Sequence, residues 1–154
     1  MKMIRTYLLL ILALLFLSAC SGLKTYPDIP GKNVRIQTKL IGSVDADISI
    51  HKVNAKCETE YLGTVELDNA VTEIGITPNQ LTYLYAEFES SGFLGKSTGT
   101  VGHGTLFRPR AGNEYRVEMR YKDDIYNVEL IELYPGKKTG KELERHGLDE
   151  CKKL

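Results

Sequence analysis

The stretch NEYRVEMRYKDDIYNVELIEL, residues 113–133, constrains the fold most, because apolar and polar residues alternate along it. Alternation with a period of two is typical of β-strands that bury one face. A two-residue turn at Asp123-Asp124 would pair Lys122 with Ile125, and apolar residues would then face each other across the hairpin. The pairs are Tyr121 with Tyr126, Met119 with Val128, and Val117 with Leu130. The stretch therefore predicts a hairpin in one register.

Beyond Leu130 the alternation changes phase, since Ile131 and Leu133 are also apolar. This predicts either a β-bulge or burial on both faces of the strand.

The same alternation recurs upstream, in ADISIHKV and LTYLYAEFES. The apolar residues that share one face of these runs are Ala46, Ile48, Ile50, Leu84, Ala86 and Phe88. Runs at 33–40, 61–67 and 71–77 are also rich in residues that suit a pleated surface. We therefore expect an all-β fold, a single antiparallel β-sandwich of about seven or eight strands.

The tail TGKELERHGLDECKKL, residues 139–154, has a different composition. Thr139 could cap a short helix from Glu142 to His146 that Gly147 interrupts. Such a helix is marginally stable alone. The sequence thus predicts a short C-terminal helix after the sandwich.

Residues 1–19 have the composition of an export signal. Lys2 and Arg5 precede an apolar run from Tyr7 to Ala19, which is shorter than the roughly 20 residues that span a bilayer. We expect this segment to be removed on export.

Residues 20–32 contain Pro27 and Pro30 and show no periodicity. This composition predicts a short tether that leads into a single sandwich domain at residues 33–154. No later apolar run is long enough to cross a membrane.

The four residues Leu17-Ser18-Ala19-Cys20 resemble the lipobox of bacterial lipoproteins. The resemblance implies that the Cys20 thiol receives a diacylglyceryl group and that the new amine is acylated after cleavage. Acyl chains contribute about 0.8 kcal/mol per buried CH₂, so three chains would anchor the protein stably. Ser21 stands where an Asp would favour the inner membrane, which implies the outer membrane, facing the periplasm.

If Cys20 is lipidated, two cysteines remain, Cys57 and Cys151. An extracytoplasmic compartment is oxidising, so we expect them to form a disulfide; two free thiols are the alternative.

The segment LFRPRAGNEYRVEMRY, residues 106–121, resembles part of small extracytoplasmic sandwich modules of the PEGA type. This resemblance implies a fold rather than a function.

The segment GFLGKSTGTVGHG, residues 92–104, contains partial matches to two catalytic motifs. A phosphate-binding loop would need glycine at position 90, where Ser90 stands, and a helix after it. A serine-hydrolase elbow at Ser97 would also need a following helix, and a histidine such as His146. The glycines argue against a helix. We expect a loop between strands, with Lys96, Ser97 and His103 as possible binding residues.

The charge balance and motif content exclude several classes of function. Loss of Lys2 and Arg5 leaves 18 basic against 20 acidic residues, which does not favour nucleic-acid binding. Histidine and cysteine spacing predicts no metal site, and nothing predicts a cofactor. Asp45 and Asp47 are interpreted as turn residues rather than calcium ligands.

We therefore expect a membrane-anchored envelope lipoprotein that presents a non-catalytic sandwich to a protein or cell-wall partner. A lipid-anchored immunity or inhibitor protein against a toxin or lysozyme-like enzyme is the first alternative. A hydrolase is the second.

Overall fold

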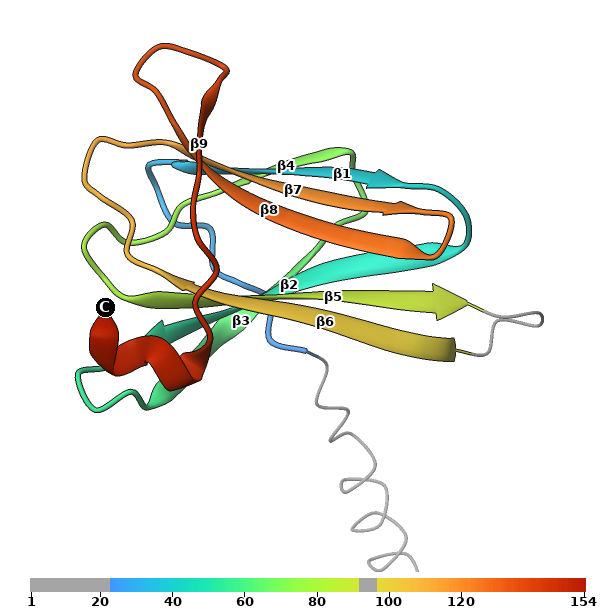
Figure 1. The fold of residues 1–154 in the computed structure, drawn as a ribbon, viewed down its shortest axis with the longest axis horizontal. Coiled ribbons are helices and arrows are strands. Elements are labelled where there is room, and N and C mark those ends of the chain that lie inside the picture. The colour runs from blue at the N-terminus through green and yellow to red at the C-terminus, as the bar shows by residue number, and fades with distance from the viewer. Residues whose placement is uncertain (1–22, 92–96) are drawn as a thin grey trace, which may run out of the picture.

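The computed structural model describes residues 23–91 and 97–154, and it places nine strands and one 3₁₀ helix in them (Figure 1). The elements are β1 (Val34–Leu40), β2 (Val44–Val53), β3 (Thr59–Glu66), β4 (Val71–Ile74), β5 (Thr82–Ser91), β6 (Ser97–Phe107), β7 (Tyr115–Lys122), β8 (Ile125–Leu133), β9 (Gly140–Glu142) and η1 (Leu148–Lys153). Within these ranges no helix is long and apolar enough to cross a membrane.

The strands form two sheets that face each other, as Figure 1 shows. One sheet has the order β4-β1-β7-β8-β9 and the other β3-β2-β5-β6. The predicted all-β sandwich is confirmed. Its sheets are antiparallel except where β1 runs parallel to β7, from Val34 beside Tyr115 to Leu40 beside Tyr121.

The β7–β8 hairpin has the predicted register. Met119 pairs with Val128 and Tyr121 with Tyr126. Asp123 and Asp124 both have positive φ angles, 52° and 60°, as a tight two-residue hairpin turn requires. The ladder continues past Leu130 without a bulge, and Ile131 and Leu133 are half-buried. Partial burial on both faces therefore explains the change of phase.

The core lies between the sheets and is built from the alternate residues that the sequence pattern predicted. Ile48, Ile50, Ala86 and Phe88 from one sheet belong to the same buried cluster as Val117 and Met119 from the other. Full burial of such a side chain contributes about 1.5–3 kcal/mol, so this cluster fixes which face of each strand points inward.

The glycine-rich segment was expected to be a loop, and this prediction is wrong for residues 97–104, which begin β6. At two of their glycines, Gly102 and Gly104, the space that a side chain would take is filled by tyrosines of the neighbouring strand β5. A Cβ on Gly102 would lie 1.9 Å from the Tyr85 hydroxyl oxygen, and one on Gly104 would lie 1.7 Å from that of Tyr83. The tyrosine rings lie across β6, and pairing with β5 outweighs the weak strand propensity of glycine.

The helix expected from Glu142 to His146 is absent: residues 140–142 form β9, and the helix lies at Leu148–Lys153. The Leu143 N–H donates to the Leu130 carbonyl, and the His146 carbonyl accepts from the Leu106 N–H. The tail thus crosses from one sheet to the other. These backbone bonds replace the intrahelical bonds of a helix that is marginal by itself. The strand count exceeds the predicted seven or eight because β6 and β9 were expected to be loop and helix.

The segment before β1 contacts the domain although we expected a tether there. Thr25 forms a parallel bridge with Thr64, and the Tyr26 hydroxyl donates to the Gly75 carbonyl at 2.9 Å. Gly63, with φ of 150°, permits this approach, because a Cβ there would lie 2.5 Å from the Tyr26 Cα. Tyr26 is buried in the core. Cys20 and the lipobox lie outside the described residues.

Cys57 and Cys151 form the expected disulfide, with 5.9 Å between their Cα atoms. Cys151 is buried beside Val53, Leu81 and Leu106 in a small cluster on the outer side of the β3-β2-β5-β6 sheet. The disulfide and this cluster attach η1 to the sheet.

We predict that the double variant Cys57→Ser/Cys151→Ser exposes the C-terminal segment to proteases before the sandwich unfolds. The bond closes a loop with a sequence separation of 94, and loss of it should lower the free energy of unfolding by at most about 4–5 kcal/mol. Limited proteolysis with intact-mass detection should show cleavage between residues 143 and 154 first. Simultaneous cleavage throughout the domain would contradict this order.

Candidate binding face

The residues proposed for a binding loop are not brought together. Lys96 lies outside the described residues. Ser97 begins β6 and His103 lies six residues further along the same strand, which is roughly 20 Å in extended chain. Ser97 and His103 are therefore too far apart to contact one small ligand together.

His103 lies on the inner side of β6, where it pairs with Ala86. Its ring is 6.3 Å from that of Phe88, in an edge-to-face arrangement. Nε2 is buried and has no hydrogen-bond partner among the described residues. Burial, and to a lesser extent the positive charge of Arg145, lowers the pKa of His103. The neutral form of His103 is therefore favoured, and the residue lies at the margin of the core.

The arrangement of β6 also excludes the catalytic motifs at Ser97. A strand, not a helix, follows Ser97, so neither motif has its structural context. The His146 backbone bonds to Leu106, nine residues from Ser97 along an extended strand, or roughly 30 Å. Ser97 and His146 therefore cannot act as a nucleophile and its base.

Carboxylates gather instead on the outer face of the β3-β2-β5-β6 sheet. Asp47 on β2 pairs with Glu66 on β3 and with Glu87 on β5, and Asp45 pairs with Glu89. Residues directly opposite in antiparallel strands project to the same side, so like charges here are neighbours. None of these five carboxylates forms an ion pair with a described residue. We call Asp45, Asp47, Glu66, Glu87 and Glu89 the acidic face.

Asp47 is at the centre of this arrangement. Partial burial, followed by the negative charges of Glu87, Glu66 and Glu89, raises the pKa of the Asp47 carboxyl from 3.8 to about 6. The ionised form is therefore disfavoured by the fold, and a cationic group placed over Asp47 would relieve the repulsion.

The acidic face continues into a hollow of about 580 Å³ at one end of the sandwich. Five carboxylates line it, and no lysine or arginine does. They are Asp45, Asp47, Glu66, Asp68 and Glu89. Within residues 23–91 and 97–154, no three Asp, Glu, His or Cys side chains converge as metal ligands would. The hollow therefore suits an extended cationic surface better than a single metal ion.

An aromatic row lies next to the acidic face on the same side of the sheet. The His51 ring is 5.2 Å from that of Tyr61 and 6.1 Å from that of Tyr83, and Tyr83 stacks near Tyr85 at 6.4 Å. Burial lowers the pKa of His51, which favours its neutral form. Rings of this kind offer apolar and cation–π contacts to a partner.

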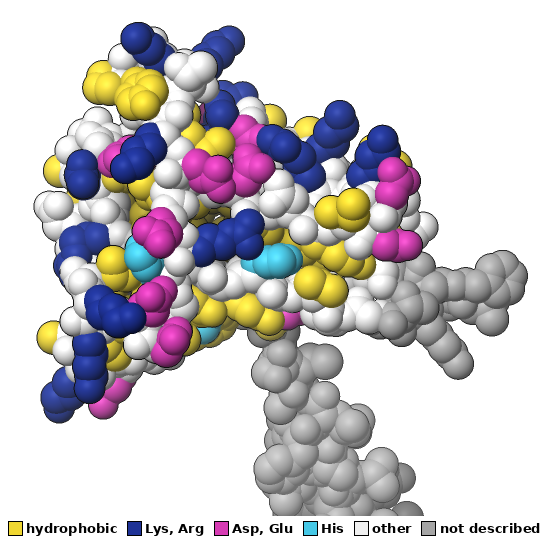
Figure 2. Space-filling model, viewed as in Figure 1, with side chains coloured by type: hydrophobic (Ala, Val, Ile, Leu, Met, Phe, Trp, Pro, Cys, Tyr) yellow, Lys and Arg dark blue, Asp and Glu magenta, His cyan; other side chains and the backbone are white. Residues whose placement is uncertain are grey.

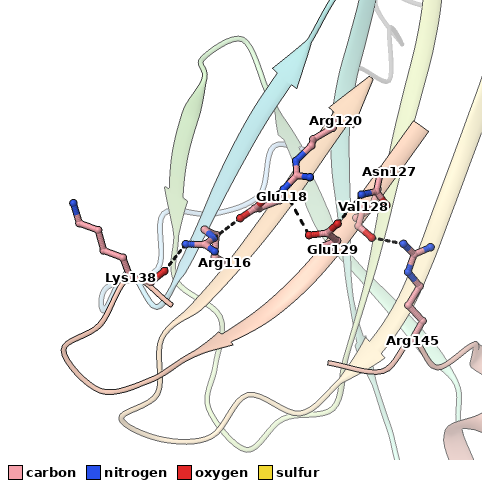
Figure 3. Close-up of polar contacts among 8 residues, drawn as sticks. All are labelled: Arg116, Glu118, Arg120, Asn127, Val128, Glu129, Lys138 and Arg145. Carbon is pink, nitrogen blue, oxygen red and sulfur yellow. Dashed lines mark hydrogen bonds and ion pairs between the residues drawn. The ribbon is translucent and has the colours of Figure 1, made fainter. Parts of the chain in front are cut away.

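The outer face of the other sheet has charged residues too, but they neutralise one another. Figure 3 shows Arg116 and Arg120 directed at Glu118, with Arg116 Nε 2.7 Å from the Glu118 Oε1. Arg120 also lies 3.7 Å from Glu129, which accepts a 2.7 Å bond from Asn127. Basic and acidic side chains are likewise intermixed over the side of the molecule seen in Figure 2.

Sequence reasoning missed the acidic face because it treated Asp45 and Asp47 as turn residues. They lie within β2, not before it. The signal was present: in each of the two alternating runs, ADISIHKV and LTYLYAEFES, the residues opposite the apolar face include acidic residues. The local sequence pattern does not show that β2 pairs with both β3 and β5.

Comparison with known proteins identifies no family. No family model matches the chain, and no curated protein matches it. Among solved structures, transthyretin from Sparus aurata aligns with a TM-score of 0.46 and 13% identity, over 68% of this chain and all of that one. Sea bream transthyretin in complex with thyroxine aligns with a TM-score of 0.45 and 13% identity, over 66% of this chain and 96% of that one. These values are too low to indicate a shared function.

We predict that Asp47→Asn stabilises the protein in a pH-dependent way. A carboxyl whose pKa is raised by folding stabilises the fold below its unfolded pKa of about 4, and this contribution is lost as the pH rises through about 6. Asparagine cannot ionise, so the variant should gain about 1 kcal/mol at pH 8, after allowance for solvent screening, and nothing at pH 4.

Urea denaturation at both pH values measures this difference. Asp47→Glu, which keeps an ionisable carboxyl, is the matched control and should retain the wild-type pH dependence. Equal stabilisation by Asp47→Asn at pH 4 and pH 8 would contradict the electrostatic explanation.

Proposed function

We propose that this protein is a lipid-anchored lipoprotein of the bacterial envelope that binds a basic protein partner through its acidic face, without catalysing a reaction. The observation that carries the proposal is the group of carboxylates that form no ion pair with a described residue, on one face of a sandwich whose other face pairs Arg116 and Arg120 with Glu118. Like charges directly opposite on neighbouring strands destabilise a sheet. A cationic partner offsets that cost on binding.

The position of the N-terminal segment supports a role close to a membrane. Lys24 to Tyr26 run beside β3, which carries Glu66 of the acidic face. Only four residue steps separate Cys20 from Lys24, which is at most about 14 Å of extended chain. If Cys20 carries lipid, the sandwich is held near the bilayer and its partner is reached at that surface. We propose the outer membrane, facing the periplasm, on the basis of Ser21.

A lipid-anchored immunity or inhibitor protein is the second candidate. The hollow lined by five carboxylates favours it, because a recess of this charge can take a protruding cationic side chain of a toxin or lysozyme-like enzyme. Both functions use the same surface and differ in whether the partner loses activity when bound.

Replacement of Cys20 by Ser tests the anchor. The lipobox resemblance predicts that the variant no longer incorporates labelled palmitate and no longer fractionates with membranes. Metabolic labelling and membrane fractionation measure these two properties. A Cys20→Ser variant that still labels and still sediments with membranes would refute the lipoprotein assignment.

Affinity capture from solubilised membranes tests the binding face. The double variant Glu66→Gln/Glu87→Gln removes the two carboxylates that flank Asp47 and should reduce the captured partner at least fivefold. Glu142→Gln/Glu144→Gln removes the same charge from the exposed C-terminal segment and should leave capture unchanged. Equal capture by both double variants would exclude the acidic face as the binding surface. Capture should also fall as ionic strength rises.

A further inference from the structure

Most sheet edges in the described structure are short or covered. β4 has four residues and β9 has three. Beyond β9, the edge of β8 is covered by the C-terminal segment: the Leu143 N–H bonds to Leu130, and the Arg145 guanidinium bonds to the Val128 carbonyl (Figure 3). The edge of β3 is paired at Thr64, whose N–H donates to the Lys24 carbonyl and whose carbonyl accepts from the Tyr26 N–H. Exposed edges invite pairing with other chains, and these features prevent it.

The edge strand β6 differs, because it has 11 residues and only one end of it is covered. Figure 1 shows the C-terminal segment crossing β6 near the end that leads to Phe107. There the Leu106 N–H donates to the His146 carbonyl at 2.8 Å.

The Leu106 bond also shows which backbone groups face away from β5. In an antiparallel ladder, successive residues bond alternately to one side and the other. Since Leu106 bonds away from β5, the N–H and C=O groups of Gly104, Gly102 and Thr100 face away from it too. None of these groups has a hydrogen-bond partner among the described residues. They form a row that a further strand can pair with.

The surroundings of this row define the side chains that an added strand would need. On the outer side, the Tyr85 and Tyr83 rings lie across Gly102 and Gly104. On the neighbouring strand β5, Glu87 pairs with Gly102 and Glu89 pairs with Thr100. Strands are about 4.8 Å apart, so a lysine or arginine on an added strand could reach across the glycine to Glu87, roughly 10 Å away. Its stem would lie on the tyrosine ring.

On the inner side, the added strand would face Val101 and His103, which are half-buried. These neighbours favour apolar residues at the alternate positions. An added strand with basic and apolar residues in alternation therefore matches both sides of β6.

We propose that the edge of β6 from Thr100 to Gly104 binds an extended peptide segment of a partner, with lysine or arginine at alternate positions, by adding it as a fifth strand to the β3-β2-β5-β6 sheet. The expected positive charge of this segment depends on the proposed function, in which the acidic face binds a basic partner. The strand pairing rests on the backbone of β6. Strand addition gives affinity through main-chain hydrogen bonds and specificity through alternate side chains.

A peptide with both ends blocked and the sequence Lys-Val-Lys-Val-Lys-Val tests the proposal on the full chain in detergent. Amide hydrogen exchange followed by NMR should slow at least tenfold at Thr100, Gly102 and Gly104 when the peptide saturates the protein. Thr100→Pro removes one outward N–H without touching the ladder to β5 and should weaken binding at least fivefold. Thr100→Val keeps the N–H and should bind as the wild type does.

The outcomes separate the two proposals. If the peptide perturbs Asp47 and Glu66 but leaves the three amides unprotected, strand addition is refuted and the acidic face stands. If a peptide with Asp in place of Lys protects the amides equally, β6 pairs with added strands of either charge, and the proposal of a basic partner is refuted. Amides already protected without peptide, in a particle of twice the mass, would show that a second copy occupies the edge and would overturn the proposal. Unchanged binding by Thr100→Pro would also overturn it.

Discussion

The burial of Ile48, Ile50, Ala86 and Phe88 against the opposite sheet is the interaction on which the rest of the structure depends. Because side chains alternate along a strand, these inward residues force their neighbours outward. A register shift by one residue would turn Asp47 and Glu87 into the core, at a cost that no described contact offsets. The apolar core therefore places Asp47 beside Glu87, and the β2–β3 pairing places it beside Glu66.

This constraint explains why the two outer faces differ. On β7 and β8 the outward residues include both arginine and glutamate, so pairing brings opposite charges together and Glu118 lies between Arg116 and Arg120. On β2, β3 and β5 the outward charged residues at this end are all acidic, and pairing brings like charges together. Such a face costs stability in the isolated protein, because like charges lie opposite one another. The proposed cationic partner would offset that cost on binding.

The sequence was sufficient to predict the structure where the local pattern and the strand pairing agree. The β7–β8 hairpin is such a case, because its alternation and its Asp123-Asp124 turn specify one register. It also predicted the Cys57–Cys151 disulfide, from the number of cysteines and the extracytoplasmic compartment that the lipobox resemblance implies. It was insufficient where a distant neighbour decides the outcome. The glycines at 102 and 104 lie in a strand because Tyr85 and Tyr83 of β5 lie across them, and the extended tail depends on Leu106 and Leu130. The acidic face depends on three strands being adjacent, which local periodicity does not specify.

The central claim is that folding crowds unneutralised carboxylates around Asp47. Carbon-detected NMR titration of the carboxyl groups in the folded protein tests it most directly, because each Asp and Glu is followed separately. Asp47 should titrate near pH 6, because partial burial, followed by the charges of Glu87, Glu66 and Glu89, raises its pKa from 3.8. A midpoint near pH 4 for Asp47 would show that neither its partial burial nor the neighbouring carboxylates disfavour the ionised form, and would contradict the proposal that this face calls for a cationic partner.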